Sequence, residues 1–259
     1  MGEDLPIGGV TARELQDYQL YRIPNAHRRT VDYEIDVVRA FLNWCRVRKW
    51  VRENVADKEH VERLINKKTK GNEKRVFTDD ELKVLLDPHS NAHWQYPYIF
   101  APLYYTGLRI GELGHLRVKD LDLVRHEIDV RGKTMKVPVW DAERQRNFVR
   151  ELQWTPKWYE ERTIPIDSRL EPILREFQER KRDNNTGLYF QGPRGNQITD
   201  QISRWIKRLT GRQDVSAHTF RHTHISYTLN RWGRHLSVVQ HWVGHKRLDT
   251  TMEYIHTSV

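Results

Sequence analysis

Histidines, an arginine and a tyrosine lie at short intervals near the end of the chain, within otherwise amphipathic helical sequence: His218, Arg221, His245 and Tyr254. Arg109 and Lys133 are further basic candidates upstream. An arginine fork binds phosphate oxygens bidentately, a histidine can move a proton near neutral pH, and a tyrosine oxygen can act as a nucleophile. Together these side chains suit phosphoryl transfer without a metal.

Two pairs of histidines, each spaced by one helical turn, raise zinc binding as an alternative interpretation. His218 and His222 form the first pair, and His241 and His245 form the second. Arg221 lies inside the first pair, and no cysteine is near either of them. Because a cation is unfavourable beside Zn²⁺ and closed zinc sites commonly use cysteine, we expect no metal and no cofactor.

The balance of charge points to a polyanionic partner, above all nucleic acid. The chain has 44 lysines and arginines against 35 aspartates and glutamates, which gives a net charge of +9. Residues 1–66 are neutral, and the basic excess lies in residues 67–76 and in the C-terminal part. Such an excess attracts phosphate backbones.

Neither a membrane span nor a secretion signal is predicted. No stretch approaches the ~20 apolar residues that a membrane-spanning helix needs, and the N-terminus lacks the apolar core of a signal peptide. The single cysteine, Cys45, excludes an internal disulfide and lies in a helical apolar pattern, so we expect it to be buried. We therefore expect a cytoplasmic, DNA-associated protein without a membrane partner.

The chain is long enough for two domains, and residues 1–66 are predicted to form a helical one. Thr11 begins a capping-box pattern, and the helix it starts should end before Pro24. A third helix is predicted over residues 58–66, and the basic, glycine-containing residues 67–76 are the predicted linker. Between the first and third helices, apolar residues at three- and four-residue steps predict a second helix with one buried face: Val31, Ile35, Val38, Phe41, Leu42 and Cys45.

Residues 77–259 are predicted to form a second domain. Another capping box begins at Thr78, and Gly107 marks a helix end that places Arg109 at the start of the next helix. Alternating or extended segments predict strands at 121–122, 127–131, 137–139 and 162–166. Helical spacing predicts helices over 96–105, 141–154, 171–182 and 199–209. The expected fold class is mainly α with a small antiparallel β-sheet (α+β).

Four segments occur in order along this second domain: Thr106-Gly-Leu-Arg109-Ile-Gly-Glu112-Leu, Ala217-His218-Thr-Phe-Arg221-His222-Thr, Val-Gly-His245 and Thr250-Thr251-Met-Glu-Tyr254-Ile-His256. They resemble the motifs of the tyrosine recombinases, the phage and plasmid integrase and Xer family. The resemblance covers all of residues 77–259, which would be the catalytic domain. Residues 1–66 resemble that family's core-binding domain, which binds DNA.

By this resemblance, Arg109 and Arg221 would clamp the non-bridging oxygens of the scissile phosphate and stabilise the charge of a pentacoordinate transition state. His245 would donate a hydrogen bond to the phosphate. Glu112, one turn after Arg109, matches a structural carboxylate that would orient this arginine. Tyr254 would attack the phosphorus, form a 3′-phosphotyrosyl link and release a 5′-hydroxyl.

Two proton transfers complete the implied reaction. His218 would assist proton transfer at the nucleophile, and Lys133, in the turn after a predicted strand, matches the family's lysine that protonates the leaving oxygen. The family's next strand best matches residues 162–165, which leaves residues 134–161 as an insertion. Lys136-Val-Pro138-Val is a competing match for that strand. Because of the insertion, Lys136 is the alternative acid.

The leading hypothesis is a site-specific DNA recombinase or integrase. A homo-tetramer would cleave and exchange strands between two paired sites on double-stranded DNA, with a monomer or dimer when free. Religation would need neither ATP nor metal, because the tyrosyl link stores the phosphodiester energy. The alternatives are a type IB topoisomerase-like or telomere-resolving enzyme, which usually has different flanking domains, and a catalytically silent DNA-binding relative. The competent residues at every catalytic position argue against a silent relative.

Overall fold

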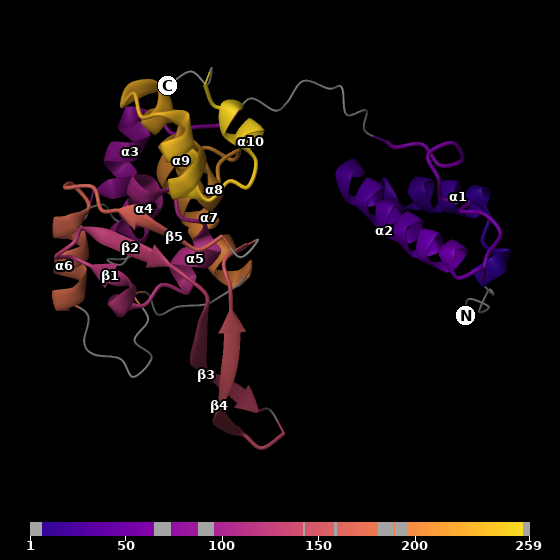
Figure 1. Ribbon diagram of the computed structural model, residues 1–259, viewed down its shortest axis with the longest axis horizontal. Helices are drawn as coiled ribbons and strands as arrows, with labels where there is room; N and C mark the ends of the chain where they lie inside the picture. Colours follow the sequence, from indigo (N-terminus) through magenta and orange to yellow (C-terminus); the bar gives the residue numbers. More distant parts are fainter. Residues whose placement is uncertain are drawn as a thin grey trace. The chain divides into compact units, whose positions relative to one another are not determined.

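The computed structural model of the protein describes residues 7–64, 74–87, 96–141, 143–157, 160–180, 189 and 196–255. The chain divides into two compact units, Met1–Asn72 and Glu73–Val259 (Figure 1). Residues 67–73 of the predicted linker lie outside the described residues. Among the helices that are described, none is long and apolar enough to cross a membrane.

Two helices, α1 (Ala12–Arg22) and α2 (Arg28–Val47), form most of the first unit, after a short 3-10 turn, η1 (Ile7–Gly9). The predicted capping box is present. The Thr11 hydroxyl accepts the Glu14 amide at 3.3 Å, and the Glu14 carboxylate accepts the Thr11 amide at 2.7 Å. The helices and the segment after them enclose a small apolar core: Leu15, Ile35, Leu42, Ala56 and Val61.

The buried face of α2 is narrower than the sequence predicts. Ile35 and Leu42 are buried, and Cys45 is fully buried as predicted. Phe41, which was expected on the same face, is 51% exposed and instead stacks on Trp44 with 6.1 Å between the ring centroids. Within the described part of this unit, the core therefore covers one stripe of the helix, and an aromatic stripe beside it faces outward.

The third helix predicted over residues 58–66 is wrong for its described part. Residues 58–64 form turns and bends, and the last two residues lie outside the described ranges. Side chains of α2 bind backbone groups of this segment instead. Arg39 donates to the Val61 carbonyl at 3.2 Å, and the Asp32 carboxylate accepts the Leu64 amide at 2.8 Å. These bonds satisfy groups that a helix would have paired internally.

Most of the described elements of the second unit are helices: α3 (Asp79–Leu86), α4 (Pro97–Thr106), α5 (Ile110–Gly114), α6 (Glu171–Arg180), α7 (Asn196–Thr210), α8 (Ala217–Ser226), α9 (Leu236–Val243) and α10 (Leu248–Met252), with a 3-10 turn η2 (Val118–Asp120) and a π-helical turn η4 (Tyr227–Arg231). The apolar α4 is buried on nearly all sides and packs against α8. It ends at Gly107, whose φ is +65°, and a Cβ there would lie 2.6 Å from the His224 ring. The close approach requires glycine at this helix end, as the sequence predicts.

Three short strands form an antiparallel sheet in the order β1 (Leu121–Asp122), β2 (Glu127–Val130) and β5 (Arg162–Pro165). Ile128 pairs with Leu121 on one side and with Ile164 on the other, and all three side chains are buried. The expected fold class, mainly helical with a small antiparallel sheet, is confirmed. The register places Arg162 at the start of β5, opposite Val130.

A separate two-stranded hairpin, β3 (Lys133–Asp141) and β4 (Arg146–Trp154), projects from the body of the second unit (Figure 1). The helix predicted over residues 141–154 is therefore wrong. Two of the residues that gave the helical spacing, Phe148 and Leu152, are 43% and 37% exposed, so among the described side chains these two form no buried helical face. The stabilising partner is β3, whose backbone pairs with β4 along its full length, and Lys133 begins this strand instead of lying in a turn.

Candidate active site

Arg109 is the residue before α5, and its guanidinium group is fixed by contacts from both of its terminal nitrogens. Its Nη1 donates to Glu112 Oε1 at 2.9 Å, and its Nη2 donates to the Gly244 carbonyl at 2.9 Å. The Glu112 carboxylate also accepts the Arg109 amide at 2.8 Å. The side chain remains 20% exposed, so part of the guanidinium group is accessible to a ligand.

Arg221 lies on α8 and is almost fully buried. Its Nη1 donates to the Gly107 carbonyl at 2.7 Å, and its Nη2 donates to the Val243 carbonyl at 2.5 Å. Burial, and then the charge of Arg109, lower the pKa of Arg221 to about 9, although Glu112 acts in the opposite direction. Arg221 is still protonated at neutral pH, and carbonyl groups do not neutralise it. An anion brought to this position would therefore be strongly favoured.

Tyr254 follows α10 and is buried, with its hydroxyl beside His222. Its Oη lies 2.5 Å from His222 Nδ1, and Asn230 Nδ2 donates to the Tyr254 carbonyl at 2.8 Å. The ring packs in a small apolar cluster with Val239 and Val243. Burial raises the pKa of Tyr254 to about 12. The hydroxyl is therefore protonated at neutral pH and is held in one orientation.

The two predicted histidines lie close to His222 and Tyr254. The His218 ring meets the His222 ring at 4.6 Å and 83°, and the His245 ring lies 6.4 Å from the Tyr254 ring with its Nδ1 2.9 Å from Thr251 Oγ1. Loss of solvent, and then the charge of Arg221, lower the pKa of His218 to about 4 and that of His245 to about 3. Both imidazoles are therefore neutral at neutral pH.

Glu112 and Arg162 form a buried ion pair whose role the sequence did not indicate. Arg162 donates to both carboxylate oxygens of Glu112, at 3.0 Å through Nη1 and at 2.7 Å through Nη2. Burial alone would raise the pKa of Glu112, but the hydrogen bonds and charges of Arg162 and Arg109 lower it. Glu112 is thus a carboxylate shared by two arginines. The only signal for Arg162 was its place as the basic residue at the start of a predicted strand.

Lys133 makes its described polar contact outside the cluster of the other predicted residues. Its buried ammonium forms an ion pair with Asp120 at the end of η2 and lies 5.6 Å from the centre of the Trp154 ring. Burial lowers the pKa of Lys133, and Asp120 acts against this effect. Among the described residues, no hydrogen bond joins Lys133 to the arginines, histidines or tyrosine of the cluster. The alternative, Lys136, pairs through its backbone with Glu151, and its side chain lies outside the described part.

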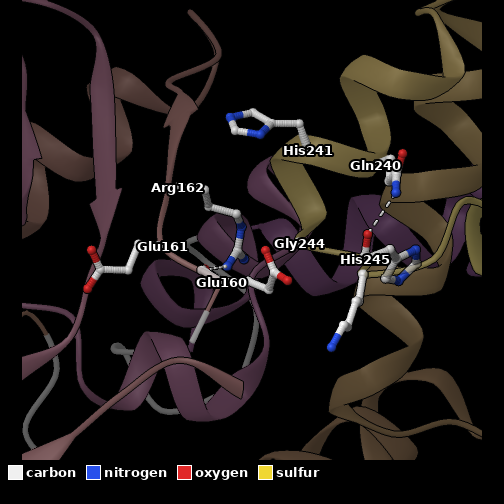
Figure 2. Close-up of a pocket in the computed structure, with 8 residues that line it drawn as sticks. Glu160, Glu161, Arg162, Gln240, His241, Gly244 and His245 are labelled. Carbon is white, nitrogen blue, oxygen red and sulfur yellow. Dashed lines mark hydrogen bonds between the residues drawn. The ribbon is translucent and has the colours of Figure 1, made fainter. Parts of the chain in front are cut away.

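A pocket of about 270 Å³ opens beside the cluster, and Figure 2 shows its lining: Glu160, Glu161, Arg162, Gln240, His241, Gly244, His245 and Lys246. Arg162 reaches from β5 towards Gly244 at the end of α9. In the part of the chain that the structure describes, no three His, Cys, Asp or Glu side chains are grouped so as to hold a metal. The arrangement presents fixed positive charge, neutral imidazoles and a buried tyrosine hydroxyl, which suits attack on a phosphate group.

The model of the phage integrase family matches residues 75–259. The tyrosine recombinase XerC of Staphylococcus epidermidis is 26% identical over 269 aligned positions, which cover 99% of this chain and 80% of that protein. A tyrosine recombinase of Thermosipho africanus is 24% identical over 235 positions, which cover 88% of this chain and 72% of that protein.

Solved structures share the fold. The Tn1549 transposon integrase in complex with a circular intermediate DNA has a TM-score of 0.74 at 17% identity, covering 98% of this chain and 83% of that chain. A lambda integrase dimer bound to a COC′ core site has a TM-score of 0.65 at 14% identity, covering 99% and 83%.

The helical fold with its small sheet, together with these matches, defines a tyrosine recombinase. The chain belongs to the phage integrase family, and its activity is site-specific DNA recombination, in which DNA is cleaved and rejoined. The family resemblance, the enzyme class and the fold predicted from the sequence are confirmed.

Proposed function

We propose that Tyr254 is the nucleophile of a metal-independent strand transfer on double-stranded DNA. Its Oη attacks the scissile phosphorus, the bond from phosphorus to the 5′ oxygen breaks, and the protein is left joined to DNA by a 3′-phosphotyrosyl link. The observation that most supports this assignment is the buried Tyr254 hydroxyl, oriented by His222 and close enough to Arg221 for its charge to affect the tyrosine pKa.

Arg109 and Arg221 bind the non-bridging oxygens of the scissile phosphate in this proposal. Both guanidinium groups are already held by backbone carbonyls, so they do not have to be ordered when charge develops on the phosphate. His245, fixed by Thr251, donates a further hydrogen bond to the phosphate. Among the described ion pairs, Arg109 and Arg162 share one carboxylate, Glu112, so the positive charge of the arginines is only partly neutralised and favours an anion.

The tyrosine proton passes to an imidazole. His222 touches the hydroxyl, and His218, the residue predicted for this role, lies next to His222. On religation the same imidazole returns the proton to the tyrosine oxygen as the link is broken.

Lys133 protonates the 5′ oxygen as it leaves. To do so, its ammonium group must leave Asp120 and contact the leaving oxygen. Burial lowers the pKa of Lys133 and therefore favours transfer of its proton. A duplex with sulfur in place of the bridging 5′ oxygen tests this role, because a thiolate leaves without a proton. Lys133→Ala should cleave this duplex nearly as fast as the wild type does; rescue of Lys136→Ala alone would identify Lys136 as the acid.

The partner is double-stranded DNA, and four copies of the chain act on two paired sites. The Tn1549 and lambda integrase structures, which contain DNA, support DNA as the partner. In this proposal residues 1–66 are the core-binding domain, residues 67–76 are the linker and residues 77–259 are the catalytic domain; the two compact units, Met1–Asn72 and Glu73–Val259, divide within that linker. This division agrees with the charge, because the first 66 residues are neutral and the basic excess follows them.

Covalent capture tests the proposed function. The full chain is incubated with a randomised pool of duplexes nicked so that religation is impossible, and the DNA in detergent-resistant adducts is sequenced. The recovered sequence, placed in one nicked duplex, is called the captured duplex below. Wild type and Tyr105→Phe should form the adduct, with or without EDTA, and Tyr254→Phe should form none. An adduct with Tyr254→Phe would overturn the assignment of the nucleophile.

A further inference from the structure

Three arginines bind the last carbonyl groups of one helix. The C-terminal end of α9 carries carbonyls without helical partners and the negative end of the helix dipole, and both favour cations there. Each arginine donates a hydrogen bond to a different carbonyl group. Arg162 Nε donates to the Trp242 carbonyl at 2.6 Å, Arg221 Nη2 to the Val243 carbonyl at 2.5 Å, and Arg109 Nη2 to the Gly244 carbonyl at 2.9 Å. Two of these arginines are assigned to the phosphate, and the third is unassigned.

Arg162 is too enclosed to contact DNA. Its side chain is 1% exposed, and of the five N–H groups of a guanidinium, four donate within the protein, to Trp242, Glu160 and twice to Glu112. Gly244 closes over it, because a Cβ at this residue would lie 3.0 Å from Arg162 Nη1. Figure 2 shows the guanidinium group beside Gly244. Any effect of Arg162 on the reaction must therefore pass through its partners.

The main partner, Glu112, also holds Arg109. Arg162 occupies one side of both carboxylate oxygens, so that Arg109 binds Glu112 through a single side-chain nitrogen, Nη1. Arginine and carboxylate otherwise prefer a bidentate pair. If Arg162 were absent, Glu112 would be free to take both nitrogens of Arg109 and would compete with the phosphate for them.

We infer that Arg162 is a positioning residue, which keeps Glu112 engaged so that Arg109 stays directed at the scissile phosphate. This inference rests on the proposed function. The buried ion pair of Arg162 and Glu112 then sets the geometry of Arg109, the arginine proposed to contact DNA. Arg162 lies on β5, outside the four sequence motifs of the site.

The test compares two forms of the captured duplex, one with the natural scissile phosphate and one with a methylphosphonate, which lacks the non-bridging charge that Arg109 contacts. Single-turnover cleavage and DNA binding are measured for the full chain, for Arg162→Met and Arg162→Lys, and for Arg175→Met as a control. Arg175 is also paired to a glutamate, Glu171, but lies on the exposed face of α6.

Arg162→Met should bind the natural duplex normally and cleave it about 100-fold more slowly, the effect of a small misplacement of a catalytic group. On the methylphosphonate the same variant should lose no more than about 3-fold, since the contact from Arg109 no longer matters. Arg162→Lys should recover little, because lysine cannot bridge both oxygens. Equal losses on both duplexes would mean that Arg162 only stabilises the fold, and would overturn the inference.

Replacing both Arg162 and Glu112 by neutral residues distinguishes an effect on the position of Arg109 from an effect on the stability of the fold. Arg162→Met leaves Glu112 with one partner in the core, and this loss can unfold the chain. The double variant Arg162→Met with Glu112→Gln removes both charges and with them the carboxylate that would compete for Arg109, so it should melt close to the wild type and cleave the natural duplex faster than Arg162→Met alone. Cleavage by a folded double variant that is no faster than that of Arg162→Met would also overturn the inference. An adduct with Tyr254→Phe, by contrast, would contradict the proposed function and not the role of Arg162.

Discussion

Tyr254 and His222 share a hydrogen bond in which neither group is charged at neutral pH. Burial raises the pKa of Tyr254 to about 12. Burial, and then His218, Lys74 and Arg221, lower the pKa of His222 to about 3. In the proposed mechanism the proton therefore stays on the tyrosine until a negative phosphate enters and favours the protonated imidazole. The substrate itself would then activate the proposed nucleophile.

The first residue-scale prediction concerns His222. His222→Ala should slow single-turnover cleavage of the captured duplex by about 100-fold, within the range for loss of a general base, without weakening DNA binding. His126→Asn is the matched control, because His126 is exposed, paired with Glu171 and away from the site. Cleavage by His222→Ala at the rate of the wild type would show that His218 accepts the proton directly.

A second prediction concerns pH and stability. His224 is buried with Nδ1 2.8 Å from the Tyr104 carbonyl, and burial lowers its pKa to about 4. An unfolded histidine titrates near pH 6.5, so between these values the unfolded chain binds more protons than the folded one. Stability should be complete above about pH 6.5 and should fall as the pH falls towards 4. Denaturant midpoints measured across this window should fall less in His224→Phe; an unchanged slope would contradict the assignment.

The motif residues could be predicted from the sequence because each lies in a short pattern of its own. Arg109, Arg221 and Tyr254 were identified in this way. The contacts of His222 and Arg162 could not be predicted. His222 meets a residue 32 positions later, and Arg162 meets one 50 positions earlier. These residues are brought into contact only by the packing of α9 and β5 against the centre of the unit. Such contacts between distant residues leave no local pattern in the sequence.

At the scale of elements, the end of α9 is the part on which the site depends most. Gly244 has a φ of +63°, and a side chain there would meet Arg162. Gly233 has the same φ, but nothing lies within 4 Å of its hypothetical Cβ. Substitutions at these two glycines therefore distinguish the effect of backbone strain, which both share, from the effect of contact with Arg162, which only Gly244 has.

The third prediction uses this pair of glycines. Gly233→Ala should cost about 1 kcal/mol of unfolding free energy, the strain of a left-handed alanine, and leave cleavage of the captured duplex unchanged. Gly244→Ala should cost more than this and should also slow cleavage, because Arg162 and the Gly244 carbonyl must shift. Denaturant melts and single-turnover rates measure the two effects. Equal behaviour of the two variants would mean that the contact with Arg162 is unimportant.

Elements with local start and stop signals could be predicted, and elements made by distant pairing could not. The capping boxes at Thr11 and Thr78 and the glycine end of α4 are all present. The segment over residues 146–154 has helical spacing, yet it forms β4, because β3 offers it a backbone ladder that no local signal reveals. Residues 58–64 likewise do not form the predicted helix, because side chains of α2 hydrogen-bond to their backbone groups.

At the scale of the whole molecule, the charge of +9 is unevenly distributed, with the first 66 residues neutral. The fourth prediction follows from this excess. Binding of the captured duplex to Tyr254→Phe, which avoids covalent attachment, should weaken on the order of 1,000-fold between about 50 and 200 mM salt, as phosphate contacts release counterions. Fluorescence anisotropy at several salt concentrations measures the slope. A flat profile would mean that apolar contacts dominate recognition.

The three arginines at the end of α9 bind carbonyl groups and not side chains, and this limits how the protein can change over time. Trp242 and Val243 could be exchanged for other apolar residues, since their carbonyls would remain in place. Gaining or losing one residue here would rotate the helix end by about a quarter of a turn and take all three carbonyls away from their donors at once. Among relatives of this protein, we therefore expect the residue types at positions 242 and 243 to vary, Gly244 to be kept, and no residue to be inserted or deleted in this segment.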